Sequence, residues 1–97
     1  MKVEEVYKNY DVNWIKTVVY GGHTYDYYDV LNNTYHSRSK QLSYERNLVL
    51  IKDLKYLLQA LDMIEILGYD EFISELDNMN FKDKINLKRI GEMINES

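Results

Sequence analysis

The sequence has no cysteine and no proline among its 97 residues, and only two histidines. Without cysteine the chain can form no disulfide, no thiolate nucleophile and no cysteine-based zinc finger. His23 and His36 are the only imidazoles left as ligands, so we expect neither a metal site nor a cofactor. The longest stretch without Asp, Glu, Lys or Arg is Thr17 to Tyr25, nine residues, whereas a membrane-spanning helix needs about 20 apolar residues. We therefore expect no membrane span.

The start of the chain, Met-Lys-Val-Glu-Glu, places two carboxylates where a signal peptide would have its apolar region. The expected location is the cytoplasm of the host cell. Asn, Lys, Ile and Tyr, whose codons are A/T-rich, make up 36 of the 97 residues. This composition indicates a low-GC genome, or a phage or other mobile element of such a genome.

Length and charge limit the classes of protein that the chain could belong to. A chain of 97 residues with 45% hydrophobic content is the size of one small domain, which we place at residues 1–97. Its net charge of −4, from 12 Lys and Arg against 16 Asp and Glu, argues against a general nucleic-acid coat protein, because phosphate binding relies on basic side chains. A local basic patch is still allowed.

The first third of the sequence predicts a helix followed by a hairpin. From Val3, apolar residues recur at the spacing of one helix face. The segments Val12–Tyr20 and His23–Leu31 are rich in β-branched and aromatic residues, and Gly21-Gly22 separates them. A two-residue glycine turn between such segments predicts an antiparallel hairpin. Its register would place four aromatic rings on one face: Trp14, Tyr20, Tyr25 and Tyr27.

The segment Leu42–Leu67 predicts a long helix, because its apolar residues are spaced alternately four and three apart. They are Leu50, Leu54, Leu57, Leu61 and Ile64. A straight helix of this length would span about 39 Å at 1.5 Å per residue, so it must break, project, or pack on a second copy as a homodimer. Gly68 is expected to end it, Asp70 to cap a short helix, and a final helix to cover residues 86–95.

These elements predict an α+β fold: a short N-terminal helix, a tyrosine-rich antiparallel β-hairpin, and a helical C-terminal half built on one long helix. Residues 1–34 would hold the first helix and the hairpin, and residues 41–97 the helical part.

Acidic residues gather in one block. Residues 62–80 carry six carboxylates and no Lys or Arg. The six are Asp62, Glu65, Asp70, Glu71, Glu75 and Asp77. Such a block is either a solvated helix face or a surface that occupies a basic groove on a partner protein.

A second block is basic. It spans residues 36–55, and Tyr35 and Tyr44 beside its cations could stack on bases. Its cations are Arg38, Lys40, Arg46, Lys52 and Lys55. The block is either a solvated connection or a nucleic-acid patch.

No catalytic motif is present. The chain has no P-loop and no dinucleotide fingerprint, and the serines near His36 form no triad from neighbouring positions. We therefore interpret the protein as a non-enzymatic protein-binding module, such as a phage or mobile-element inhibitor of the anti-CRISPR type. Its partner would be a nuclease or another nucleic-acid-binding protein with a basic groove, contacted by the acidic block and the four aromatic rings. The alternative is a nucleic-acid-binding accessory protein that uses residues 36–55.

Overall fold

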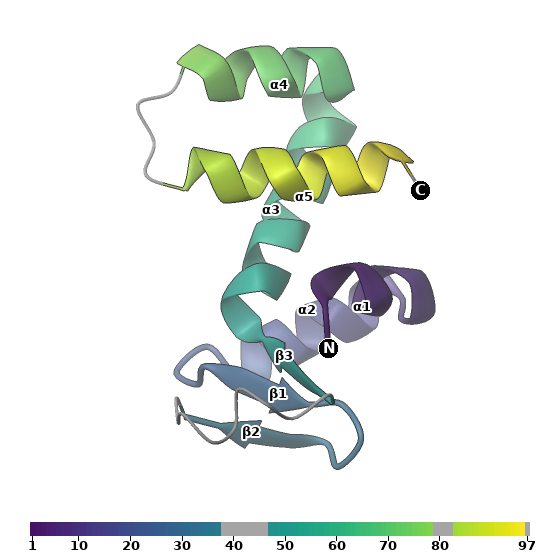
Figure 1. The fold of residues 1–97 in the computed structure, drawn as a ribbon, viewed down its shortest axis with the longest axis vertical. Coiled ribbons are helices and arrows are strands. Elements are labelled where there is room, and N and C mark those ends of the chain that lie inside the picture. The colour runs from purple at the N-terminus through teal and green to yellow at the C-terminus, as the bar shows by residue number, and fades with distance from the viewer. Residues whose placement is uncertain (38–46, 79–82, 97) are drawn as a thin grey trace. The chain divides into compact units, whose positions relative to one another are not determined.

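A computed structural model describes residues 1–37, 47–78 and 83–96 and shows an α+β fold (Figure 1). Within these ranges the chain forms five helices and one three-stranded antiparallel sheet. The predicted fold class is therefore confirmed. The chain divides into two compact units, Met1–Lys55 and Tyr56–Ser97. We refer to them as the mixed unit and the helical unit.

The first helix, α1 (Val3–Asn9), confirms the predicted opening helix. Val3 and Val6 lie one turn apart and are both buried. Glu4 and Glu5 lie in its first turn and Lys8 in its last. These charges oppose the partial charges of the two helix ends and so favour the helix.

The second helix, α2 (Val12–Gly21), occupies the segment for which we predicted the first hairpin strand. That prediction is wrong. The Asp11 side chain caps the helix by accepting the backbone N–H of Trp14 at 2.7 Å. Ile15 and Val18 are buried at helical spacing. Gly21-Gly22 ends the helix instead of turning a hairpin.

A tyrosine-rich antiparallel hairpin does form, but further along the chain. It joins β1 (Tyr27–Asp29) to β2 (Thr34–His36), and its turn includes Asn33 at a φ of 55°. The third strand, β3 (Leu48–Leu50), pairs with the other side of β1, which gives the order β2-β1-β3.

The register of the sheet decides which side chains face α2. Tyr28 lies opposite both Tyr35 and Val49, so these three residues share one face of the sheet. The Tyr35 hydroxyl donates to the backbone oxygen of Val18 at 2.8 Å, and the Tyr28 ring meets Trp14. The core of the mixed unit therefore lies between this face and α2.

The predicted long helix is shorter than expected. The helix α3 covers Ile51–Leu67, Leu48–Leu50 belongs to β3, and residues 42–46 lie outside the described part of the chain. Leu48–Leu50 is extended because its backbone pairs with β1. The N–H of Ile51 also donates to the oxygen of Asp26 at 3.0 Å. The boundary between the two units falls inside α3, after Lys55.

The helical unit contains the rest of α3, α4 (Tyr69–Asn78) and α5 (Lys84–Glu96). Gly68 ends α3 at a φ of +82°, as predicted. The helix α4 begins at Tyr69, so Asp70 lies in its first turn and is not its cap. The final helix is confirmed and extends past both predicted ends. Gly91 of α5 packs against the buried Phe72 ring of α4.

Candidate functional site

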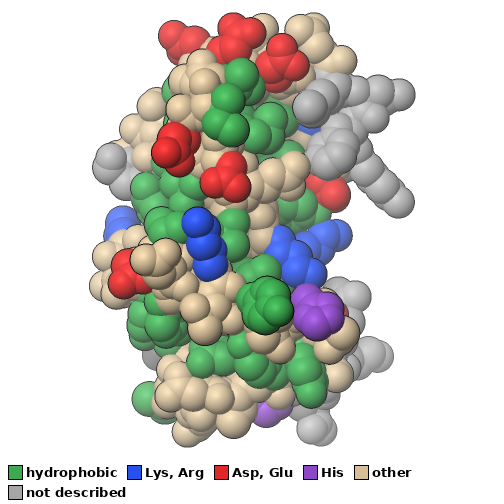
Figure 2. All heavy atoms as spheres, turned by 180° about the vertical axis from the view of Figure 1, so that it is seen from behind, with side chains coloured by type: hydrophobic (Ala, Val, Ile, Leu, Met, Phe, Trp, Pro, Cys, Tyr) green, Lys and Arg blue, Asp and Glu red, His purple; other side chains and the backbone are tan. Residues whose placement is uncertain are grey.

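The outer side of α4 carries a row of exposed carboxylates. Phe72 and Leu76 are buried, which turns the other side of the helix toward solvent. We call the exposed carboxylates of that side the acidic face. They are Asp70, Glu71, Glu75 and Asp77. Figure 2 shows acidic side chains gathered where α4 lies, at the top of the view. Their exposure fits both interpretations of the acidic block, a solvated helix face and a contact surface for a partner.

Most carboxylates of the acidic face form no ion pair with another residue that the structure describes. Within the described ranges, the only ion pair of this face joins Asp77 to the Lys88 ammonium at 3.9 Å, and both side chains are exposed. Asp62 and Glu65, the other two carboxylates of the predicted block, are exposed on α3. The structure therefore leaves most of the block available to solvent or to a partner.

Negative charge also surrounds Tyr69 at the start of α4. Partial burial raises the pKa of Tyr69, and the carboxylates of Glu92, Glu96 and Asp70 raise it further. Glu92 and Glu96 lie in the last two turns of α5. The carboxylates near the end of α5 therefore lie close to the first turn of α4.

The four predicted aromatic anchors do not share a face. Trp14 and Tyr20 lie on α2, Tyr25 lies between α2 and β1, and Tyr27 lies on β1. The common face is a wrong prediction because it depended on a strand at residues 12–20. Tyr20 is 86% exposed and Tyr25 is 43% exposed, whereas Trp14 and Tyr27 are half-buried. Binding of a partner by these rings stays a prediction.

A cluster around Asp29 was not predicted from the sequence. This carboxylate is only 7% exposed. It accepts the backbone N–H groups of Leu31 at 3.0 Å and Asn32 at 2.9 Å, and side-chain amides of Asn32 and Asn47. An Asp followed by Asn three residues later is a turn signal that could have located it. The cluster holds the turn between β1 and β2 and joins it to the start of β3.

We expect the Asp29 cluster to make stability depend on acid pH. Hydrogen bonds from Asn32, and then from Asn47 and Leu31, lower the pKa of Asp29 from 3.8 to about 2, although burial opposes them. Because the folded pKa lies below the unfolded one, the stabilisation is complete above about pH 4 and is lost as pH falls toward 2. In thermal unfolding across this range, the melting temperature of Asp29→Asn should depend less on pH than that of the unchanged chain. At pH 7 its melting temperature should be lower by about 5 °C or more.

The control for this prediction is Asp62→Asn, which removes an exposed carboxylate on α3. It should leave both the melting temperature and the pH dependence unchanged. If Asp29→Asn also melted like the unchanged chain at every pH, the cluster would have no role in stability.

The basic block can be placed only in part. Lys52 and Lys55 are exposed on α3. Arg38, Lys40 and Arg46 lie outside the described residues. A nucleic-acid patch therefore stays a prediction.

Most of the residues predicted to form a homodimer contact are buried or half-buried within the chain itself. Leu50 lies on β3 and not on the helix. Leu54 and Leu57 are completely buried, and Leu61 and Ile64 are half-buried. The homodimer stays a prediction to which these positions add no support.

Among the described residues, no three His, Cys, Asp or Glu side chains group as a metal site would require. The Thr34 hydroxyl lies 3.1 Å from Nε2 of His36, two residues along β2. Within the described ranges this is the only hydrogen bond of the His36 ring, so no carboxylate orients the imidazole as a nucleophilic dyad requires. The same ranges contain no helix with the length and apolar character to span a membrane.

The comparisons with known proteins add no function. No protein-family model, curated protein or solved structure matches this chain.

Proposed function

We propose that the chain is a non-enzymatic protein-binding module that occupies a cationic surface of its partner through the acidic face of α4. The observation that carries this proposal is the exposure of all four carboxylates on one helix, with a single long ion pair among them in the described part of the chain. A surface that brings like charges together without neutralising them favours a partner of opposite charge.

The distribution of charge between the two units supports the same proposal. The mixed unit holds eight Lys and Arg against seven Asp and Glu, whereas the helical unit holds four against nine. The negative charge of the protein is thus concentrated in the unit that carries the acidic face. A cationic partner would be steered toward this unit over other parts of the chain.

The class of partner follows from this charge. Proteins that bind nucleic acid expose Lys and Arg along a groove to contact phosphates, and carboxylates on successive helical turns can occupy such a groove. We therefore propose a nuclease or another nucleic-acid-binding protein as the partner, inhibited sterically. Inhibitors encoded by phages or other mobile elements, including those of the anti-CRISPR type, are the proteins whose activity should be tested first.

Removing carboxylates from the acidic face should weaken binding to the partner. Glu71→Gln with Glu75→Gln removes two charges one turn apart on the acidic face. We expect this pair to weaken the complex about tenfold, or ~0.7 kcal/mol per carboxylate. The tagged protein would be used to capture partners from a lysate of its native host. The affinity of each captured protein would then be measured by biolayer interferometry, with and without duplex DNA as competitor.

The matched control is Glu4→Gln with Glu5→Gln, which removes two exposed charges from α1 in the mixed unit. This control should bind the partner as tightly as the unchanged chain does. Duplex DNA should compete with both proteins for the partner. Equal weakening by both pairs, or no weakening by either, would contradict the acidic face as the contact surface. A salt-sensitive mobility shift of the DNA by the purified chain would instead favour the nucleic-acid-binding alternative.

A further inference from the structure

The single tryptophan of the chain lies face to face with a tyrosine. The ring centroids of Trp14 and Tyr10 are 4.0 Å apart and their planes differ by 21°. The hydrogen bond from the backbone N–H of Trp14 to the Asp11 side chain fixes the start of α2. Both rings are half-buried. Two aromatic π systems at this separation are in direct contact, so an electron can pass between them without an intervening group.

Trp14 touches a second ring, which differs from Tyr10 in its surroundings. Tyr28 meets Trp14 edge-on, with centroids 5.9 Å apart and planes at 78°. The Tyr28 hydroxyl donates to the side-chain oxygen of Asn33 at 2.9 Å. Tyr35, the next ring beyond Tyr28 at 4.8 Å, donates to a backbone oxygen. Both phenols are thus bonded to amide oxygens, which are poor proton acceptors.

Proton release decides where an oxidised tyrosine is stable. A phenol that loses an electron becomes a long-lived neutral radical only if its proton also leaves. Tyr28 is only 6% exposed, so its phenol has little access to water as a proton acceptor. Tyr10 is half-buried, so its side chain is more accessible to water than that of Tyr28. Of the two rings that contact Trp14, Tyr10 is therefore the better final site for the radical.

We propose that Trp14 and Tyr10 form a radical-transfer pair, in which an oxidising equivalent captured at the indole ends as a tyrosyl radical at Tyr10. A diffusing one-electron oxidant, such as the azide radical, takes one electron from Trp14 and becomes azide. The indole N–H proton leaves to water. Tyr10 then gives one electron to the indole and its hydroxyl proton to water, and the indole nitrogen takes a proton back. The net transfer is one electron and one proton from Tyr10.

The single tryptophan allows this step to be measured directly. Azide radicals made by pulse radiolysis oxidise Trp14, and its absorption should decay as that of a tyrosyl radical grows. The rate should not depend on protein concentration, since the transfer is intramolecular. Tyr10→Phe keeps the stacked ring but removes the oxidisable phenol, so the fast phase should be lost. Coupling of two radicals should also give a dityrosine-linked dimer through Tyr10, detectable by mass spectrometry of peptides.

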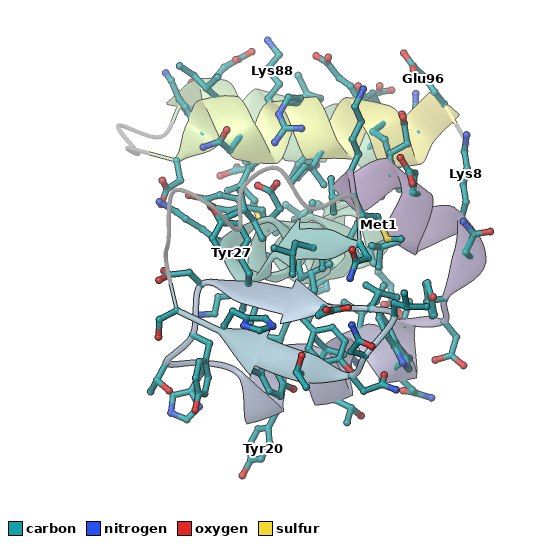
Figure 3. All side chains as sticks on the ribbon, turned by 60° about the horizontal axis from the view of Figure 1, so that its bottom comes forward. Met1, Lys8, Tyr20, Tyr27, Lys88 and Glu96 are labelled. Atoms are coloured by element: carbon teal, nitrogen blue, oxygen red, sulfur yellow. The ribbon has the colours of Figure 1, made fainter. Side chains whose placement is uncertain are left out.

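Two variants serve as controls. Tyr20→Phe alters a hydroxyl that projects outward from α2 (Figure 3) and is 86% exposed, and it should keep the fast phase. Tyr28→Phe alters the other ring in contact with Trp14 and should also keep it. Loss of the fast phase in Tyr28→Phe, its persistence in Tyr10→Phe, or a rate proportional to protein concentration would overturn the proposal. If Tyr10→Phe failed to fold, dityrosine mapping in the unchanged chain would decide between residue 10 and the other tyrosines.

Discussion

Replacing Gly91 by alanine should lower the free energy of unfolding by about 3 kcal/mol, at the upper end of the usual range for overpacked cores. A Cβ at this position would lie 2.2 Å from Cε2 and 2.8 Å from Cζ of the Phe72 ring. Phe72 is completely buried, so its ring has little room to move. Alanine in an exposed helix interior would instead stabilise by about 1 kcal/mol relative to glycine. The expected sign is therefore opposite to helix propensity.

Urea unfolding followed by circular dichroism would measure this effect. The double variant Gly91→Ala with Phe72→Leu should lose less stability than the sum of the two single variants, with a coupling of about 1 kcal/mol or more, because the smaller side chain relieves the contact. Gly68→Ala is the contrasting control. No atom lies within 4 Å of its added Cβ, but its φ is +82°, so only about 1 kcal/mol of backbone strain is expected. Additive losses in the double variant would contradict a steric cause.

Replacing Gly22 by alanine should destabilise the mixed unit by about 2–3 kcal/mol. The added Cβ would lie 2.2 Å from Cε1 of Tyr35 and 2.7 Å from Cδ1 of Ile51. The backbone is not the reason, because the φ of Gly22 is −113°, which alanine also adopts. The Tyr35 ring is held from its other end by the hydrogen bond to Val18, so moving it away from the clash would lose that bond.

The neighbouring glycine provides the matched control for this substitution. A Cβ at Gly21 would meet the Tyr35 hydroxyl oxygen at 2.7 Å, while the ring carbons stay 3.4 Å away or more. Gly21→Ala should therefore destabilise less than Gly22→Ala in the same urea titration. Hydrogen exchange of the β1 and β2 amides should also speed up more in Gly22→Ala. Equal effects at the two glycines would show that loss of glycine itself, and not the contact with the ring, is responsible.

The elements predicted correctly are those in which local signals agree with packing. The spacing of Val3 and Val6 predicts α1, and both residues are buried. Gly68 has the positive φ that a helix C-terminus favours. The apolar spacing of Leu87 and Ile90 predicts α5, and both are buried. In the two helices the same residues define the local pattern and the core, whereas Gly68 is an exposed residue that acts through its backbone conformation.

The predictions failed where β-branched residues form a helix. Val12–Tyr20 has high strand propensity, but Asp11 caps its first turn, and Ile15 and Val18 place an apolar face toward the sheet. Tertiary burial of this face outweighs the propensity, which spans only about 1 kcal/mol for strands. Asp11 is a local signal for the start of a helix, but the β-branched residues that follow it indicate a strand.

The start of α3 could not be predicted for a different reason. Leu48–Leu50 continues the apolar spacing of the helix, yet it pairs with β1, which lies about 20 residues earlier in the chain. No local pattern reports such a pairing. Among the site residues, the four carboxylates of the acidic face lie on one helix and are exposed, as both interpretations of the acidic block require. The common face of aromatic rings did not form, because it required the wrong strand.

The concentration of carboxylates in the helical unit has a consequence for the ionic strength at which the protein acts. The Debye length is about 8 Å at 0.15 M salt and about 30 Å at 0.01 M. In dilute buffer the helical unit would therefore attract any cationic protein from several side-chain lengths away. At physiological salt its field reaches little beyond the first layer of contacts, so selectivity there must come from the shape of the surface that the carboxylates line.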